Sequence, residues 1–327
     1  MKYSNIILPL LAAVALSSCN KQAATDALLP EDRIIRIETS VDPDTKGSYT
    51  SDNLDEFILF VRNETATTEG KTSYNYKVVF KKEGDDWTPQ GGVLPLWRYA
   101  EDMIHMIAIA PPAVLNNNVT YEDLVSRSDA VIASVQSVQT KEDTGSDIIG
   151  WSKCGEAWSF LKNEYGKVKI DFSHLMSKLS LSFELATEFN AQGIPANDIV
   201  SNVIISGAYN QASIDSGFMS DVVSANPKDS DSDIKAYNTK WTSASTKDEK
   251  CISEWECILV PTVPEITITI TFDVNGVAYS CNVTHRFESG CNHKLKIIVG
   301  SDVAYPSGKM SIDAWVEEGS SSDLETE

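Results

Sequence analysis

The 327-residue sequence has few cysteines, few histidines and a shortage of positive charge. None of its six cysteines stands in a C-x-x-C motif, and the four histidines show no metal-ligand spacing, so structural zinc and thiol redox chemistry are not expected. Lys and Arg number 27 against 47 Asp and Glu, and the net charge of −20 argues against nucleic acid or anionic lipid headgroups as partners. Apolar residues still make up 42% of the chain, enough for the cores of two ordinary domains or of one large β domain.

The sequence also lacks an apolar run long enough to cross a bilayer, which takes roughly 20 residues. The run from Ile6 to Leu16 is shorter, follows Lys2 and is typical of a secretory signal peptide. Its last residue, Leu16, begins the sequence LSSC (16–19), which resembles the bacterial lipobox. This resemblance implies cleavage before Cys19 and attachment of acyl chains such as palmitate to Cys19. We therefore expect a lipoprotein signal peptide over 1–18, a tether over 19–32 and a lipid anchor in the outer membrane. An ordinary signal peptide with an incidental cysteine is the alternative.

Alternation of apolar and polar residues is the dominant pattern in the rest of the chain. Residues 178–187 (KLSLSFELAT) and 265–274 (EITITITFDV) place apolar side chains at every second position, which predicts half-buried antiparallel strands. Asn275-Gly276 follows the second run and predicts a two-residue hairpin, since both turn positions need a positive φ. Cys281 then faces the core and is expected to be a buried structural thiol. The pairs that this turn sets are Val274 with Val277, Phe272 with Tyr279, Ile270 with Cys281, and Ile268 with Val283.

Further short runs of alternating, β-branched and aromatic residues predict nine more strands. These lie at 33–39, 56–62, 74–82, 103–111, 166–172, 198–209, 254–261, 293–300 and 309–317. Helical signals are few and short, at 121–126 and 173–177. The polar stretch 211–250 is predicted to be a long surface loop, and the acidic segment 319–327 a frayed tail. The predicted fold class is mainly β, with few short helices and strand spacings typical of β-sandwiches.

Five cysteines remain beyond Cys19, an odd number, so at least one has no partner within the chain. On one extended strand, Cys251 and Cys257 would lie about 20 Å apart, far beyond the roughly 7 Å between Cα atoms that a disulfide allows. The pairing state of the set stays open in the sequence. Its members are Cys154, Cys251, Cys257, Cys281 and Cys291.

The segment 166–185 (GKVKIDFSHLMSKLSLSFEL) resembles the fimbrillin family of Bacteroidales lipoproteins, whose members often carry V-x-F-x-H-x-x-S-K-L. Other resembling pieces follow in the family's order: RIETSVDPDTKGSY, LDEFILFV, DIIGW, ILVPTVPEITITITF and a closing strand pair with Trp315. The sequence departs from the family at Cys291 and in the length of 211–250. The resemblance covers essentially the whole chain. It implies two tandem β-sandwich-like (transthyretin-like) domains, over 33–173 and 174–318.

The resemblance also implies a structural or adhesive subunit of a surface pilus that is exported as an outer-membrane lipoprotein. In that family a protease cuts after a basic residue, the first strand leaves, and a donor strand from another subunit fills the groove. Here the strand would be Arg33–Ser40, with Arg33, Arg36 and Lys46 as processing candidates; Lys46 follows a turn-like DPDT. Partners would be other pilin subunits, of the same or an accessory kind, and a host or bacterial surface ligand. An uncut first strand, and a shaft, tip or anchor position, stay open.

The alternative function is a lipid-anchored surface protein that binds a glycan or another ligand, because seven tryptophans allow an aromatic platform. An enzyme is not expected. Gly70-Lys71-Thr72 lacks the first glycine of a P-loop, and the acidic run 229–233 lacks the glycine and glutamate of an EF-hand. No catalytic, cofactor-binding or metal-binding residue is therefore predicted. A glycosidase that draws two carboxylates from separate segments stays open.

Overall fold

The computed structural model describes residues 28–41, 49–63, 75–115, 118–126, 131–141, 146–161, 166–228 and 232–314. Within these ranges the chain is mainly β, as predicted, and its single α-helix is α2 (Tyr121–Val125). The Thr120 hydroxyl accepts from the Asp123 N–H, and the Asp123 carboxylate accepts from the Thr120 N–H, which caps this helix. Three short 3-10 turns are η1 (Pro112–Val114), η2 (Ala157–Leu161) and η3 (Thr187–Asn190). No helix of the described ranges has the length and apolar character needed to span a bilayer.

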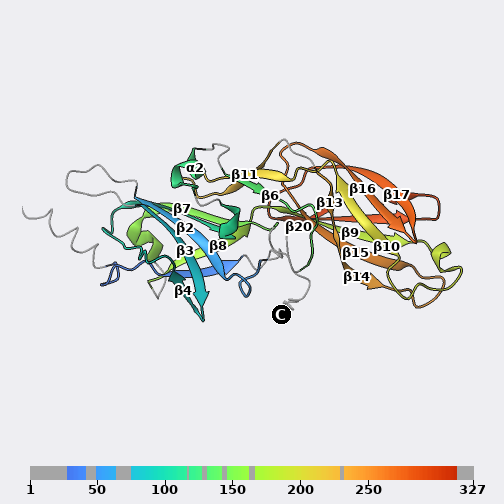
Figure 1. Ribbon diagram of the computed structural model, residues 1–327, viewed down its shortest axis with the longest axis horizontal. Helices are drawn as coiled ribbons and strands as arrows, with labels where there is room; N and C mark the ends of the chain where they lie inside the picture. The colour runs from blue at the N-terminus through green and yellow to red at the C-terminus, as the bar shows by residue number, and fades with distance from the viewer. Residues whose placement is uncertain are drawn as a thin grey trace, which may run out of the picture.

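One sheet of seven strands makes up most of the first half of the chain, in the order β1-β8-β7-β5-β2-β3-β4 (Figure 1). β1 lies at an edge and pairs in parallel with β8, whereas the other neighbouring pairs are antiparallel. β2 and β5 are nearly continuous apolar runs because both faces of the sheet are covered there. The bounds are β1 (Ile37–Val41), β2 (Glu56–Asn63), β3 (Asn75–Glu83), β4 (Asp86–Pro89), β5 (Met103–Ala110), β7 (Ile149–Glu156) and β8 (Val168–His174).

Three further sheets contain the remaining strands. The six-stranded sheet consists of β14 (Tyr237–Thr242), β15 (Cys251–Leu259), β9 (Ser177–Leu185), β18 (Cys291–Val299), β19 (Ala304–Pro306) and β20 (Ser311–Ala314), the last two both paired with β18. The four-stranded sheet has the order β13 (Ile234–Lys235), β10 (Val200–Ser206), β16 (Ile266–Val274) and β17 (Val277–His285). The three-stranded sheet consists of β12 (Ser224–Pro227), β11 (Gln211–Asp215) and β6 (Ile132–Ser134). In Figure 1 it lies between the seven-stranded sheet and the other two.

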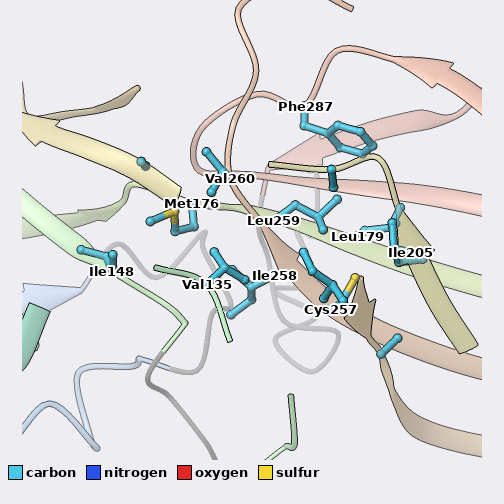
Figure 2. Packing of buried hydrophobic residues seen from close by; sticks show 14 of the residues in the cluster. Val135, Ile148, Met176, Leu179, Ile205, Cys257, Ile258, Leu259, Val260 and Phe287 are labelled. Atoms are coloured by element: carbon cyan, nitrogen blue, oxygen red, sulfur yellow. The ribbon is translucent and has the colours of Figure 1, made fainter. Parts of the chain in front are cut away.

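Two hydrophobic clusters form the core. The smaller cluster draws its members from residues 29 to 172 and includes Phe57 and Phe172 from the seven-stranded sheet. The larger cluster extends from Ile58 to Val299 and joins the other face of that sheet to the three further sheets. Figure 2 shows part of this larger cluster, in which Met176, from the turn between β8 and β9, lies among side chains of the C-terminal strands.

The predicted hairpin is confirmed residue by residue. β16 and β17 pair in the register Val274–Val277, Phe272–Tyr279, Ile270–Cys281 and Ile268–Val283. Asn275 and Gly276 have φ values of 51° and 80°, the left-handed region that this turn requires. Cys281 is buried, and its burial raises the pKa of the thiol to about 11, as expected of a structural cysteine. No disulfide joins the five described cysteines to one another, and Cys251 and Cys257 lie on one strand.

Three sequence predictions are wrong in detail. The stretch 211–250 is not one long loop, because it contains β11, β12, β13 and β14. Strands as short as β13 are too brief to leave a periodic signal in the sequence. Residues 173–177 form no helical turn, since β8 ends at His174 and β9 begins at Ser177. The first strand begins at Ile37 and not at residue 33.

Several predicted features lie outside the described residues. They are the signal peptide 1–18, Cys19 and the tether as far as residue 27, Lys46, Gly70-Lys71-Thr72, the acidic positions 229–231, Trp315 and the tail 319–327. The division into domains 33–173 and 174–318 stays a prediction.

Candidate functional site

The segment 33–41, here called the first-strand segment, lies where the two edges of the seven-stranded sheet approach each other. Its strand β1 has β8 as its ladder partner in the sheet order. On its other side, Trp87 Nε1 of β4 donates to Thr39 Oγ1 of β1 at 3.1 Å. β1 therefore lies between the two end strands of the remaining sheet, with a backbone ladder on one side and side-chain contact on the other.

One face of the first-strand segment is buried. Ile35, Ile37 and Val41 are 2%, 3% and 2% exposed and stand at even spacings, as the period of a strand requires. All three belong to the smaller core cluster, in which the rings of Phe57 and Phe172 meet edge-on with centroids 5.5 Å apart. Removal of the segment would take three apolar side chains out of this cluster and leave an apolar groove, here called the first-strand groove.

Backbone hydrogen bonds hold the same segment on both flanks. The Val168 N–H donates to the Arg36 carbonyl at 2.8 Å, where the ladder with β8 begins. Before that point the segment pairs with residues 95–97: the Ile35 N–H donates to Pro95 (3.0 Å) and the Trp97 N–H donates to the Arg33 carbonyl (2.7 Å). An emptied groove would therefore also present unpaired backbone groups, which are what an added strand bonds to.

The structure places the two described processing candidates inside this bonded segment. Arg33 is half-buried, has a positive φ of 59° and donates from its guanidinium to the Arg98 carbonyl at 3.2 Å. Arg36 is exposed and bonds Asp32 through both carboxylate oxygens, at 3.0 and 2.5 Å, which lowers the pKa of Asp32 to about 2. Since both arginine carbonyls accept backbone bonds, a protease would have to open the segment to reach either peptide bond.

The chain beyond the first strand has an anchor of its own. The Tyr49 N–H donates to Asp147 Oδ2 at 3.0 Å, and the other oxygen, Oδ1, lies 2.8 Å from His174 Nδ1. The side chains of Asp147 and His174 are both 0% exposed. We call this set the Asp147 clasp. It makes His174 a hydrogen-bonding structural residue, and it holds the chain at Tyr49 without using any atom of β1.

A second buried polar group has no counterpart in the sequence analysis. His105 Nδ1 lies 2.6 Å from Tyr121 Oη, and its Nε2 lies 2.9 Å from Ser152 Oγ. His105 is 0% exposed, so this serine–histidine contact has no surface from which a substrate could approach. It joins β5, β7 and α2. No spacing in the sequence signals it, because the three residues come from separate elements.

The six described tryptophans do not form an exposed platform. Trp97 and Trp255 are buried, and Trp87, Trp151, Trp158 and Trp241 are half-buried. Among the described side chains, no group of three or more His, Cys, Asp or Glu could hold a metal ion.

The profile of the fimbrillin-like family matches residues 44–315 of this chain, whereas no curated protein sequence matches it. A candidate cell adhesion protein from Bacteroides uniformis has a similar structure, with 17% identity, a TM-score of 0.55, and coverage of 88% of this chain and 100% of its own. Another from Bacteroides ovatus has 14% identity, a TM-score of 0.58, and coverage of 89% of this chain and 100% of its own. These likenesses show a shared fold. The family match over most of the chain shows that it belongs to the fimbrillin-like family.

Proposed function

We propose that this chain is a subunit of a lipoprotein-derived surface pilus and that it receives a donor strand in the first-strand groove. In this proposal the signal peptide 1–18 directs export, Cys19 carries the lipid to the outer membrane, and residues 19–32 tether the fold. Domains 33–173 and 174–318 then form the folded subunit. The partners are other pilin subunits, of the same or an accessory kind.

The observation that carries the proposal is the way β1 is attached. It is an edge strand with a buried apolar face, and the neighbouring strands β8 and β4 keep their other ladder partners without it. The Asp147 clasp fixes the chain at Tyr49, downstream of the strand. The sheet can therefore lose β1 and still hold the shape of the groove that β1 filled.

The position of the cut decides whether the groove empties. A cut after Arg33 would leave Ile35, Ile37 and Val41 in place, and a cut after Arg36 would still leave all of β1 (Ile37–Val41). A cut after Lys46 removes the whole strand and starts the chain at Gly47, two residues before the clasp. We therefore assign processing to Lys46.

A set of three variants tests this assignment. Lys46→Ala is expected to stay full-length in the outer membrane and to be missing from detergent-resistant pilus ladders. Arg33→Ala and Arg36→Ala remove one basic side chain each and serve as matched controls that are expected to be cut and assembled. Processing of Lys46→Ala together with loss of processing in Arg36→Ala would contradict the proposal.

A further inference from the structure

The outer face of the six-stranded sheet carries a hollow of about 430 Å³, far from the first-strand groove in sequence. Side chains of different length on the adjacent strands β15, β9 and β18 form this hollow. The central strand β9 alternates strictly, with Leu179, Leu181 and Phe183 in the core and short serines on the outer face. The longer side chains of β15 and β18 rise on either side. We call this hollow the β9 trough.

Cross-strand register gives the trough two chemically different walls. Ser180 faces Glu256 of β15 on one side and Lys294 of β18 on the other. One step along, Ser182 faces Glu254 and Lys296 in the same way. The floor therefore carries the Ser180 and Ser182 hydroxyl groups, with Glu254 and Glu256 on one wall and Lys294 and Lys296 on the other. Lys178, at the end of the floor, pairs with Glu256 at 2.7 Å, and the Ser180 hydroxyl donates to Glu256 at 3.2 Å. Ser307 and Lys309, which lie between β19 and β20, and Ser311, the first residue of β20, line the trough beyond β18.

The residues that line the trough include more lysines than carboxylates, although the molecule as a whole is acidic. Four lysines line it (Lys178, Lys294, Lys296 and Lys309) against two glutamates (Glu254 and Glu256), in a chain whose net charge is −20. Lys294 is 42% exposed and pairs at the surface with Asp313 (3.2 Å), whose side chain is 52% exposed. Lys296 is 50% exposed and bonds Glu184 (2.5 Å), whose side chain is only 15% exposed. Exposed pairs such as Lys294–Asp313 are weak, so the Lys294 ammonium group can turn to an incoming anion, while Lys296 adds positive charge beside it.

The geometry points to the β9 trough as a binding site for an acidic oligosaccharide, one that carries uronic- or sialic-type carboxylates. Ammonium groups on one wall match sugar carboxylates, while the serine floor and the glutamate wall offer donors and acceptors to sugar hydroxyls. An acidic peptide would offer the glutamate wall only its backbone N–H donors, whereas each sugar ring offers several hydroxyl groups. The volume falls in the range of small-molecule sites, roughly 300–1,000 Å³.

Titration of the purified full-length mature chain tests this. The probes are a trimer of galacturonic acid, the neutral trimer of galactose, hexaglutamate and inorganic sulfate, all at low salt, where exposed charge pairs are least screened. We expect saturable binding of the acidic trisaccharide and at least about tenfold weaker binding of the other three, with affinity that falls as salt rises. Equally tight binding of the neutral trisaccharide, hexaglutamate or sulfate would overturn the inference.

Variants locate the site. Lys294→Ala and Lys296→Ala are each expected to weaken binding about fivefold, the factor that corresponds to one exposed charge pair. Lys81→Ala, on β3 of the seven-stranded sheet, removes a lysine that is 56% exposed and is expected to bind as the parent does. Ser182→Trp fills the floor without a change of charge and is expected to abolish binding, with an unchanged circular dichroism spectrum showing that the variant is folded. Parent-like affinity in Ser182→Trp, or in both lysine variants, would refute the site.

This inference does not depend on strand exchange. The titration uses the isolated chain, so its failure would leave pilus assembly untouched, and failed assembly would leave the trough intact.

Discussion

Substitution of Ile37 tests the first-strand groove, because this residue is buried in the precursor and removed from the processed chain. Its side chain is 3% exposed and belongs to the smaller core cluster. Ile37→Ala deletes three carbons, which at about 0.8 kcal/mol each gives about 2.4 kcal/mol of lost transfer free energy. The cavity left behind adds to this, so the free energy of unfolding should fall by about 3 kcal/mol.

Equilibrium unfolding in guanidinium chloride measures this loss in the uncut precursor. Glu38→Ala is the matched control, since its side chain lies on the exposed face of the same strand and should change stability by less than about 0.5 kcal/mol. Pili assembled from the Ile37→Ala chain should then resist detergent as well as parental pili, because their subunits no longer contain residue 37. Weaker pili with this variant would show that β1 remains in the assembled subunit, and the reasoning would be refuted.

Two further predictions concern buried polar groups. Asp147→Ala removes the acceptor of both Tyr49 and His174 and should lower the free energy of unfolding by about 3 kcal/mol. The control Asp52→Ala changes an exposed carboxylate and should alter the free energy of unfolding little. Equal stability of Asp147→Ala and the parent would contradict a stabilising role of the Asp147 clasp. Burial lowers the pKa of His293 from 6.5 to about 4. The folded chain thus disfavours the charged form of His293. The contribution of the neutral His293 side chain to the free energy of unfolding is therefore complete above pH 6.5 and is lost as pH falls toward 4. As pH falls from 6.5 to 4, the melting temperature should fall less steeply in His293→Gln than in the parent. An identical pH dependence of the two melting temperatures would contradict the lowered pKa of His293.

The sequence predicts best where periodicity and turn chemistry agree. In β9, β16 and β17 the alternation fixes which face is buried, and Asn275-Gly276 fixes the register, so even the pair Ile270–Cys281 follows. The alternation in β9 also predicts part of the β9 trough, because it places Ser180 and Ser182 on the outer face of the sheet. Which side chains form its walls depends on pairing with β15 and β18, and that pairing cannot be deduced from one strand alone.

Two parts of the fold escape such reasoning for physical reasons. Short strands such as β12 and β13 are stabilised by their neighbours and not by a pattern of their own, so 211–250 reads as a loop. Asp147 stands in a segment that resembles the family, yet its role arises only when the fold brings it to Tyr49 and His174, 98 and 27 residues away. The predicted start of the first strand, residue 33, lies four residues before the observed start at Ile37. The reason is that residues 33–35 are hydrogen-bonded to 95–97 before the ladder with β8 begins.

The N-terminal residue of the chain in pili isolated from the cell surface tests the central claim most directly. If β1 is removed to open the first-strand groove, sequencing or mass spectrometry of the N-terminal peptide will show a start at Gly47. A lipid-bearing start at Cys19, or a start at Ile34 or Ile37 that leaves β1 in place, would contradict the account.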